Sequence, residues 1–326
     1  MKTTTLGASG IACESVGLGT WAMGGWMWGG GDDAAAVAAI QASLDAGVRL
    51  IDTAPAYGLG HAESLVGQAL KGRRQQAVIA TKCGLVWHTR QGEHFFDEEG
   101  QAVHRHLGRA SIFHEVEQSL ARLQTDYIDL YITHWQDAGT PVAETMDALL
   151  DLKRQGKIRA IGVSNVDPGT LAEYLRHGPV DAIQERYSLI DREIEATLMP
   201  LCRRHNVGIL GYSSLALGLL AGPIDPERRF TGDDQRADNP RFSVANRSRL
   251  QGFFAELEPL RQRLDCSASQ LMIAWTTRPG GVTVALCGAR TPQQARQNAG
   301  AAALELTPED IAAIDLAAGR HLQTLD

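Results

Sequence analysis

Four side chains able to exchange or orient a proton stand at the ends of apolar runs in the first half of the chain. Asp52 closes one such run, and Tyr57 follows it on a Pro/Gly turn within LIDTAPAYG. Lys82 closes the run AVIATK, and His134 closes YIDLYITH. Taken singly, each residue has an ordinary explanation as a helix cap, a surface side chain or a loop residue. Their common position predicts that they converge on one site.

The chemistry that suits these residues is proton transfer to a carbonyl oxygen. A free tyrosine has a pKa of about 10 and is a proton donor at neutral pH, and a neighbouring ammonium lowers that pKa. We therefore expect Lys82 to lower the pKa of Tyr57, and Asp52 to hold Lys82 in place. His134 can donate a hydrogen bond to the oxygen as negative charge develops on it. Reduction also needs a hydride source, which indicates a nicotinamide cofactor.

Apolar runs that alternate with helical patterns predict the scaffold for these residues. Continuous apolar runs are typical of strands buried on both faces, and their alternation with helices indicates a parallel sheet. Eight such units predict an α/β fold, a closed (β/α)8 TIM barrel, with an N-terminal β-hairpin ahead of it. The expected strands are 15–22, 48–54, 77–82, 127–134, 158–164, 181–187, 207–213 and 282–288, and the expected helices are 32–47, 62–72, 111–123, 141–157, 168–176, 193–205, 245–264 and 292–299.

Two long segments interrupt this alternation. Residues 84–110 and 218–241 follow expected strands, so we expect both as loops on the C-terminal face of the barrel, where such barrels place their active sites. Pro141 is expected in the first turn of its helix. No linker rich in proline and serine divides the chain, so residues 1–326 are expected to form a single domain.

The composition is that of a globular protein, with 44% hydrophobic and 21% charged residues. The formal net charge is −7 and no run of Lys/Arg exceeds two residues, so neither nucleic acid nor a membrane surface is expected as a partner. Five scattered cysteines and an opening stretch without a signal-type apolar segment are typical of a reducing compartment. We therefore expect a cytoplasmic protein.

Several well-known site motifs are absent from the sequence. The stretch GLGTWA lacks the third glycine of the Rossmann fingerprint, and no helical pattern follows it at once. Walker A, H-E-x-x-H and G-x-S-x-G motifs do not occur. His104 and His106 form a close pair in an expected loop without partners at ligand spacing, so no metal site is expected.

Ordered blocks along nearly the whole chain carry a resemblance to a known family. They are GLGTWA, LIDTAPAYG, ATK, SLARLQTDYIDLYITHW, GKIRAIGVSN, IQERYSL, GYSSLALGLLAG and GARTPQQARQN. The chain resembles the aldo-keto reductases, and it is most similar to the bacterial branch typified by general stress proteins. The resemblance implies a catalytic tetrad of Asp52, Tyr57, Lys82 and His134, with Tyr57 as general acid. It also implies NADPH extended across the barrel mouth.

The same resemblance implies which residues hold the cofactor. Ser164, Asn165 and Gln184 would hydrogen-bond the nicotinamide carboxamide, and Tyr212 would stack on the ring. The segment 218–241 would cover the pyrophosphate. The ordinary alternative is that Ser164 and Asn165 cap a helix start. The implied cofactor-binding residues are Thr20, Trp21, Asp52, Ser164, Asn165, Gln184, Tyr212, Ser213, Leu215, Gly218, Gly288, Arg290, Gln294, Gln297 and Asn298.

Arg290 favours NADP over NAD. A guanidinium fork suits a phosphate monoester, and the 2′-phosphate is what distinguishes NADP from NAD. One departure from the family pattern argues the other way, because Pro223 stands where the family often has a lysine that contacts cofactor phosphate. Candidates to replace that lysine are Arg228, Arg229 and Arg236.

Tryptophans are concentrated after the strands of the first half. They are Trp21, Trp26, Trp28, Trp87 and Trp135. Tryptophans are usually core or interface residues, but this placement predicts an aromatic substrate pocket, with Trp21, Trp87 and Trp135 as its walls. The expected substrates are small aldehydes, ketones or sugars.

Two alternatives to an NADP-linked reductase stay open. One is a nucleotide-sensing regulatory subunit, similar to the potassium-channel β subunits that resemble the same family. The other is an NAD-linked sugar dehydrogenase. The intact tetrad, including His134, favours an enzyme. The sequence leaves the physiological substrate, the reaction direction and the oligomeric state open.

Overall fold

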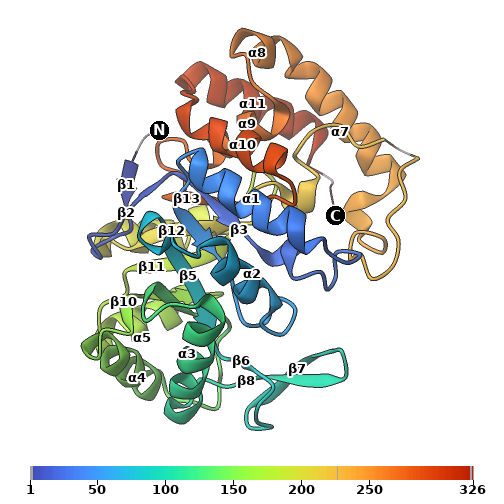
Figure 1. Ribbon diagram of the computed structural model, residues 1–326. Helices are drawn as coiled ribbons and strands as arrows, with labels where there is room; N and C mark the ends of the chain where they lie inside the picture. The colour runs from blue at the N-terminus through green and yellow to red at the C-terminus, as the bar shows by residue number, and fades with distance from the viewer. Residues whose placement is uncertain (1–2, 226, 324, 326) are drawn as a thin grey trace.

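The chain forms a closed barrel of parallel strands with helices around it (Figure 1). The computed structural model describes residues 3–225, 227–323 and 325. The barrel strands, in their order around the barrel, are β3 (Val16–Gly19), β4 (Leu50–Asp52), β5 (Val78–Cys83), β9 (Ile128–Thr133), β10 (Ile158–Ser164), β11 (Ala182–Arg186), β12 (Gly208–Tyr212) and β13 (Val284–Gly288). Each pairs in parallel with the next, and β13 pairs with β3 to close the barrel. The predicted (β/α)8 barrel is confirmed.

The helices depart from the expected pattern in the second half. They are α1 (Asp33–Asp45), α2 (His61–Ala69), α3 (Arg109–Leu123), α4 (Val142–Arg154), α5 (Pro168–His177), α6 (Leu198–His205), α7 (Val244–Glu256), α8 (Glu258–Arg263), α9 (Ala268–Thr276), α10 (Pro292–Gly300) and α11 (Pro308–His321). Pro141 is the N-cap of α4 and not part of its first turn.

The expected helix 245–264 is two helices, and two others were not expected. Pro259 lies in the first turn of α8, where its missing N–H costs no hydrogen bond, whereas it would interrupt a continuous helix. Helix α9 precedes the last barrel strand and begins with a capping box of Ser267 and Gln270. Helix α11 begins with another, formed by Thr307 and Asp310. Such pairs are sequence signals for helix starts.

The predicted N-terminal hairpin is confirmed. Strands β1 (Thr3–Thr5) and β2 (Ala12–Glu14) pair in antiparallel fashion. Leu6 and Cys13 are fully buried and belong to the same apolar cluster as the inward-facing residues of the barrel. The hairpin therefore seals one end of the barrel core and leaves the other end for the site.

Alternate residues of the strands fill the barrel interior. Side chains two positions apart lie on the same face of a strand, and a buried cluster collects inward-facing residues such as Leu50, Val78 and Leu130. Steps of two along the strands lead from this cluster to the polar residues at the barrel mouth. These polar residues are Asp52, Lys82, His134, Ser164, Gln184 and Tyr212, and the corresponding position at the end of β13 is Gly288. The barrel geometry itself therefore gathers them.

The segment 84–110 is folded, where the sequence predicted a loop. It forms an antiparallel sheet of β6 (Leu85–Val86), β8 (Gln101–Arg105) and β7 (Glu93–Glu98), which projects from the barrel body (Figure 1). His104 lies in β8 and is buried. In the segment 218–241, the residues described contain only the ends of two short 3-10 turns, η4 (Ala216–Gly218) and η5 (Pro240–Phe242).

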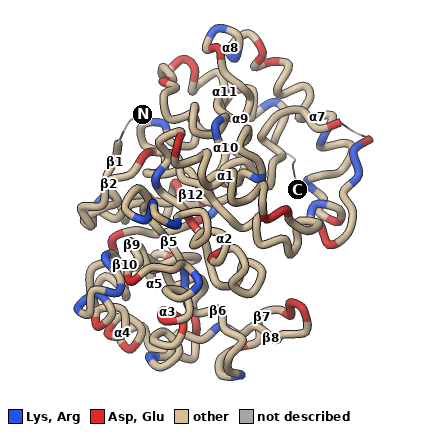
Figure 2. Tube along the Cα trace, in the orientation of Figure 1, with Lys and Arg blue, Asp and Glu red and all other residues tan. Residues whose placement is uncertain are grey.

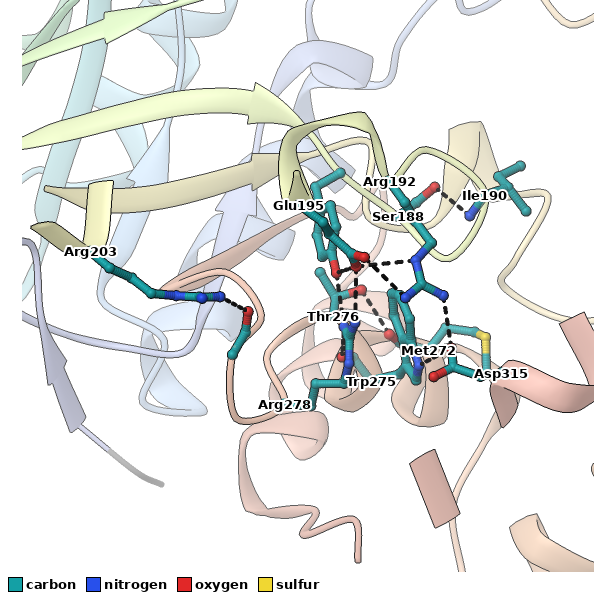
Figure 3. Close-up of polar contacts among 12 residues, drawn as sticks. Ser188, Ile190, Arg192, Glu195, Arg203, Met272, Trp275, Thr276, Arg278 and Asp315 are labelled. Atoms are coloured by element: carbon teal, nitrogen blue, oxygen red, sulfur yellow. Dashed lines mark hydrogen bonds and ion pairs between the residues drawn. The ribbon is translucent and has the colours of Figure 1, made fainter. Parts of the chain in front are cut away.

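A polar network outside the barrel fixes the segment after β11 (Figure 3). The Glu195 carboxylate accepts hydrogen bonds from Tyr187, Arg192 and Arg278 at 2.5 to 3.1 Å. Arg192 also donates to Asp315 of α11 at 2.9 Å. The guanidinium of Arg278 lies 3.6 Å above the Trp275 ring of α9. These contacts tie the residues that follow β11 to α9 and α11.

Charged residues of both signs are interspersed over the helices (Figure 2). Figure 2 shows no continuous basic stripe in this view. Among the residues described, no helix combines the length and apolar character needed to span a membrane.

A buried carboxyl lies behind the end of β5. Glu115 of α3 accepts a hydrogen bond from the Gly84 backbone N–H at 2.8 Å and another from the Ser111 hydroxyl at 3.2 Å. Gly84 has φ +93°, and an added Cβ would lie 2.4 Å from Leu107, so only glycine suits this turn. Burial raises the pKa of Glu115 to about 8, although both hydrogen bonds act in the opposite direction.

This raised pKa predicts a pH-dependent stability that Glu115→Gln should remove. A carboxyl whose pKa is higher in the folded chain stabilises the fold below its unfolded pKa, and this contribution is lost as the pH rises to about 8. The loss is about 1.4 kcal/mol per pH unit between the two pKa values. In urea unfolding, the midpoint should therefore fall between about pH 5 and about pH 8 more steeply for the parent than for the variant.

The matched control is Glu117→Gln on the same helix. Glu117 is largely exposed and pairs with Lys157, so its removal should leave the pH slope of the parent unchanged. Parallel slopes for the parent and Glu115→Gln would contradict the prediction.

Candidate active site

The four expected residues meet at the open end of the barrel. Lys82 Nζ donates to both carboxylate oxygens of Asp52 at 2.8 and 2.9 Å and to the Thr53 carbonyl at 2.8 Å. It also donates to the Tyr57 hydroxyl oxygen at 3.2 Å. The His134 ring stands edge-on to the Tyr57 ring, with centroids 5.8 Å apart. Lys82 and Asp52 are buried, whereas Tyr57 and His134 reach the surface of a cavity.

The pKa of Tyr57 is raised, where the sequence predicted a lowered value. Burial is the largest cause of the increase, followed by the negative charge of Asp52 and then by Tyr212. Lys82 does not reverse this shift, because its ammonium is held by the Asp52 carboxylate. Burial lowers the pKa of Lys82 itself, against the opposing effect of Asp52. Tyr57 is therefore a neutral phenol at neutral pH.

His134 is a neutral imidazole at neutral pH. Burial is the main cause that lowers its pKa well below the usual value, and the Lys82 charge adds to it. A neutral ring carries one N–H and can donate through it. Among the residues described, the buried Nδ1 of His134 has no hydrogen-bond partner.

These residues open onto a cavity of about 1110 Å³. Ligand pockets usually hold about 300–1,000 Å³, so this one is large enough for an extended ligand. It runs from Tyr57 past the end of β12 to the start of α10. The implied cofactor residues that line it are Trp21, Asp52, Ser164, Asn165, Gln184, Tyr212, Ser213, Leu215, Gly218, Gly288, Arg290, Gln294, Gln297 and Asn298.

Asn165 connects the strand ends near Tyr57. Its side-chain amide donates to the His134 carbonyl at 2.8 Å, and its Oδ1 accepts from the Tyr212 hydroxyl at 2.9 Å. Ser164 donates to the Gln184 carbonyl at 2.7 Å. Gln184 donates through Nε2 to Asp52 at 2.7 Å. These contacts orient Tyr212 and the amide groups around the tetrad.

Open space at two glycines marks the middle of the cavity. An added Cβ at Gly218 or at Gly288 would meet no atom within 4 Å, although both residues line the cavity. A side chain there would project into the space that a ligand would fill. Gly218 also has φ +94°, which favours glycine. Both glycines thus fit a backbone cradle for phosphates.

Three of the expected site residues do not line the cavity. Thr20 is fully buried and donates to the Asp52 carbonyl at 3.0 Å. Trp87 packs with Leu85 and Val103, outside the cavity lining, so it is not the pocket wall that the sequence predicted. Lys82 is also fully buried and does not line the cavity, but it contacts Asp52 and Tyr57, which do.

The long segment 218–241 is fastened to the glycine-rich segment 24–31. The Asp233 carboxylate accepts from the backbone N–H groups of Met27 and Gly29 at 2.8 and 2.9 Å. The Gln235 N–H donates to the Met27 carbonyl at 3.1 Å. Residues of both segments line the cavity. These contacts therefore bridge two segments of the cavity wall.

Arg290 is held from the same glycine-rich segment. Its guanidinium donates to the carbonyls of Trp28 and Gly30 at 3.2 and 2.6 Å. Its backbone N–H donates to the Gln294 side chain at 2.8 Å. Arg290, the predicted phosphate ligand, lies just before α10 and is thus held against residues 28–30, where it lines the cavity.

Of the arginines proposed to replace the missing lysine, one lines the cavity. Arg236 does so, and it pairs with Asp234 at 2.6 Å. Arg228 and Arg229 do not line it. The sequence reasoning missed Arg241, which lines the cavity and is anchored by buried Asp191 at 2.9 Å. It is the last residue of the segment 218–241, which was expected to cover the pyrophosphate, but nothing in the sequence distinguishes it from the other arginines there.

Aromatic rings surround the Tyr57 end of the cavity. Trp21 is stacked on Tyr57 with ring centroids 6.3 Å apart. Trp21 and Trp135, both predicted as pocket walls, line the cavity. Phe95 and Phe96 of β7 also line it, and the sequence did not single them out. The pair of adjacent phenylalanines was the available signal.

Comparisons with known proteins agree on one family. The model of the aldo/keto reductase family matches residues 15–318. Aldo-keto reductase YhdN of Bacillus subtilis (strain 168) is 41% identical over 297 residues, which cover 90% of this chain and 86% of that protein. A protein of Escherichia coli (strain K12) named NADH-specific methylglyoxal reductase is 40% identical over 316 residues, covering 95% of this chain and 96% of its own.

Solved structures show the same likeness. The glycerol dehydrogenase AKR11B4 from Gluconobacter oxydans aligns with a TM-score of 0.87 and 38% identity, covering 98% of this chain and 95% of its own. An aldo/keto reductase from Klebsiella pneumoniae, in complex with NADP and acetate, aligns with a TM-score of 0.73 and 30% identity. That alignment covers 97% of this chain and 95% of the other.

The buried ion pair predicts a large loss of stability in Asp52→Asn. The amide would leave the Lys82 ammonium buried without its counter-charge, which costs about 3–5 kcal/mol of unfolding free energy. The matched control, Asp45→Asn, breaks a largely exposed pair with Arg73 and should cost less than about 1 kcal/mol. Urea unfolding of the two variants checks this, and equal small losses would contradict it.

Proposed function

Because the chain belongs to the aldo/keto reductase family, we propose that it is an NADP(H)-dependent reductase of small aldehydes and ketones, able also to oxidise the matching alcohols. The observation that carries the proposal is the 3.2 Å contact between Lys82 Nζ and the Tyr57 oxygen beside a cavity of about 1110 Å³. The enzyme class follows from the family. The cofactor, the proton donor and the substrates are the proposed parts.

Tyr57 is the general acid in this proposal. Its raised pKa keeps the phenol protonated at neutral pH, as a proton donor requires. Lys82 approaches the phenol oxygen as a hydrogen-bond donor, which leaves the phenol hydrogen available to a carbonyl oxygen in the cavity. After proton transfer the ammonium stabilises the phenolate that remains, since opposite charges attract strongly in a buried site.

His134 orients the substrate and does not compete for the proton. Its lowered pKa keeps the imidazole neutral, so it can offer an N–H to the carbonyl oxygen without giving up a proton. The edge-on arrangement of its ring to Tyr57 lets both groups address one oxygen atom. Two donors on one oxygen stabilise the negative charge that develops there.

The cavity fits a nicotinamide dinucleotide, which when bound supplies the hydride that the carbonyl carbon accepts. Tyr212, Asn165 and Gln184 would hold the nicotinamide end near Tyr57. The cradle at Gly218 and Gly288 would take the phosphates. The anchored guanidinium of Arg241 would offset part of their charge.

The choice between NADP and NAD rests on Arg290. Its guanidinium lines the end of the cavity that would hold the adenosine, and the carbonyls of residues 28 and 30 fix its orientation. The NADP in the Klebsiella pneumoniae relative supports NADP. The Escherichia coli relative is called NADH-specific, so the alternative, an NAD-linked enzyme, is the second candidate.

Tyr57→Phe tests the proposed acid. Loss of the hydroxyl should lower kcat for reduction by roughly 10²–10⁴, the usual contribution of a general acid, while cofactor affinity changes little. Nicotinamide absorbance measures the rate, and fluorescence titration measures the affinity. Tyr127→Phe is the matched control, because the Tyr127 ring lies between Arg74 and Arg159 away from the cavity. Unchanged turnover in Tyr57→Phe would refute the assignment.

Arg290→Ala tests the cofactor preference by fluorescence titration of binding. Loss of a charged hydrogen bond to the 2′-phosphate should weaken NADPH binding by about 10- to 100-fold and NADH binding much less. Arg296→Ala, an exposed change on the helix α10 that follows Arg290, is the matched control. If Arg290 only anchors the glycine-rich segment, NADPH and NADH will lose affinity equally, and the second candidate is then favoured.

A further inference from the structure

We propose that the stacked pair Trp26 and Phe96 sets substrate specificity, and that the pocket selects carbonyl compounds with a flat apolar group over polyols. The inference rests on the proposed carbonyl reduction and deepens it by naming a substrate class. Trp26 comes from the glycine-rich segment 24–31, and Phe96 comes from the projecting sheet β6–β8–β7 (Figure 1).

A continuous set of ring contacts forms the wall. Trp26 and Phe96 are stacked with centroids 4.8 Å apart and an interplanar angle of 25°. Phe95 contacts Phe96 at 5.5 Å and Trp135 at 5.2 Å. All four rings line the cavity that contains Tyr57. The wall thus runs from the first barrel loop, across the sheet, to the residue next to His134.

A bulge in β7 turns two adjacent phenylalanines toward the cavity. Consecutive residues of a regular strand point to opposite faces. The pairing of β7 with β8 shifts register between His94 and Phe96, and such a bulge re-aims side chains. Phe95 and Phe96 both line the cavity as a result. The bulge makes this face of the sheet a binding surface.

The Trp26 side of the wall is fixed by the contacts that bridge the cavity. Asp233 accepts from the N–H groups on either side of Trp28, at Met27 and Gly29. Arg290 holds the carbonyls of Trp28 and Gly30. The Trp28 ring in turn meets Trp21 edge-on at 5.4 Å. Trp26 is therefore presented from an anchored segment and not from a free loop.

The polarity of the wall indicates which substrates it favours. Besides the rings, this end of the cavity is lined by Ala22, Ala56 and Leu85. Two polar groups nearby already have partners, since the Asn165 amide donates to the His134 carbonyl and Asp52 accepts from Gln184. A polyol would bury hydroxyls without partners, which costs about 1–3 kcal/mol for each group. An aryl group would instead stack on the wall.

This class differs from those named for the relatives. One related structure is called a glycerol dehydrogenase, and one relative is called a methylglyoxal reductase. Both names refer to small polar molecules. The aromatic wall of this chain therefore predicts a different order of preference.

The experiment compares benzaldehyde with methylglyoxal in reduction, and benzyl alcohol with glycerol in oxidation, in the holoenzyme. We expect the parent to prefer the aromatic member of each pair in kcat/KM. Phe96→Ala and Trp26→Ala should each raise KM for benzaldehyde by about 10-fold, with kcat and the methylglyoxal constants little changed. Benzoate should likewise bind Phe96→Ala more weakly than the parent, as measured by quenching of tryptophan emission.

His94→Ala is the matched control, because His94 lies on the same strand, is exposed and does not line the cavity. It should leave every constant unchanged and so exclude general disruption of the sheet. If the parent prefers glycerol or methylglyoxal, or if Phe96→Ala weakens all substrates equally, the inference is wrong although the reductase assignment stands. No turnover of any carbonyl by the parent would overturn the reductase assignment and the inference together.

Discussion

The site depends on one buried interaction, the pairing of the Lys82 ammonium with the Asp52 carboxylate. A charge placed alone inside the barrel would lose its hydration at a cost of several kcal/mol. The carboxylate compensates for that loss, and the Thr53 carbonyl and the Tyr57 oxygen accept the remaining hydrogens. The pair is therefore stable only as a unit. It also positions the ammonium that donates to the Tyr57 oxygen at 3.2 Å.

The same pairing explains the protonation states around it. Because Asp52 offsets the Lys82 charge, burial decides the behaviour of Tyr57, and the phenol stays protonated. Burial, with a smaller contribution from the Lys82 charge, lowers the pKa of His134 and keeps its imidazole neutral. Tyr57 thus carries a proton that can be transferred, and His134 carries an N–H that can donate a hydrogen bond. This division of roles suits the reduction of a carbonyl, whose oxygen must accept both the hydrogen bond and the proton.

Around this centre, peripheral segments shape the space that a cofactor and a substrate would share. The glycine-rich segment 24–31 contributes in two ways. Trp26 joins the aromatic wall, and the N–H groups of Met27 and Gly29 donate hydrogen bonds to the Asp233 carboxylate. Positive φ angles at Gly25, Gly29 and Gly30 let the backbone present its N–H and carbonyl groups in this way. In the proposed enzyme, the barrel residues carry the proton transfer and these segments set the substrate selectivity.

Much of the barrel could be predicted because its signals are local. Continuous apolar runs indicated the strands, and Asp52, Lys82 and His134 stand at or just after the ends of three strands that are consecutive in the barrel, so strand order was enough to bring them together. The capping box of Ser267 and Gln270 is a local signal for the start of α9, although the apolar periodicity alone did not indicate this helix.

The sequence by itself therefore determined the barrel and the residue types at its mouth, because both follow from local apolar patterns and from the pairing of successive strands. Only the tertiary structure decided the rest. The pKa of Tyr57 depends on how far burial outweighs a compensated charge, and the position of Trp87 depends on how the sheet β6–β8–β7 packs. The partners of Arg290 lie some 260 residues away in the chain. Each of these outcomes depends on residues that are distant in the sequence, so no local sequence pattern encodes it.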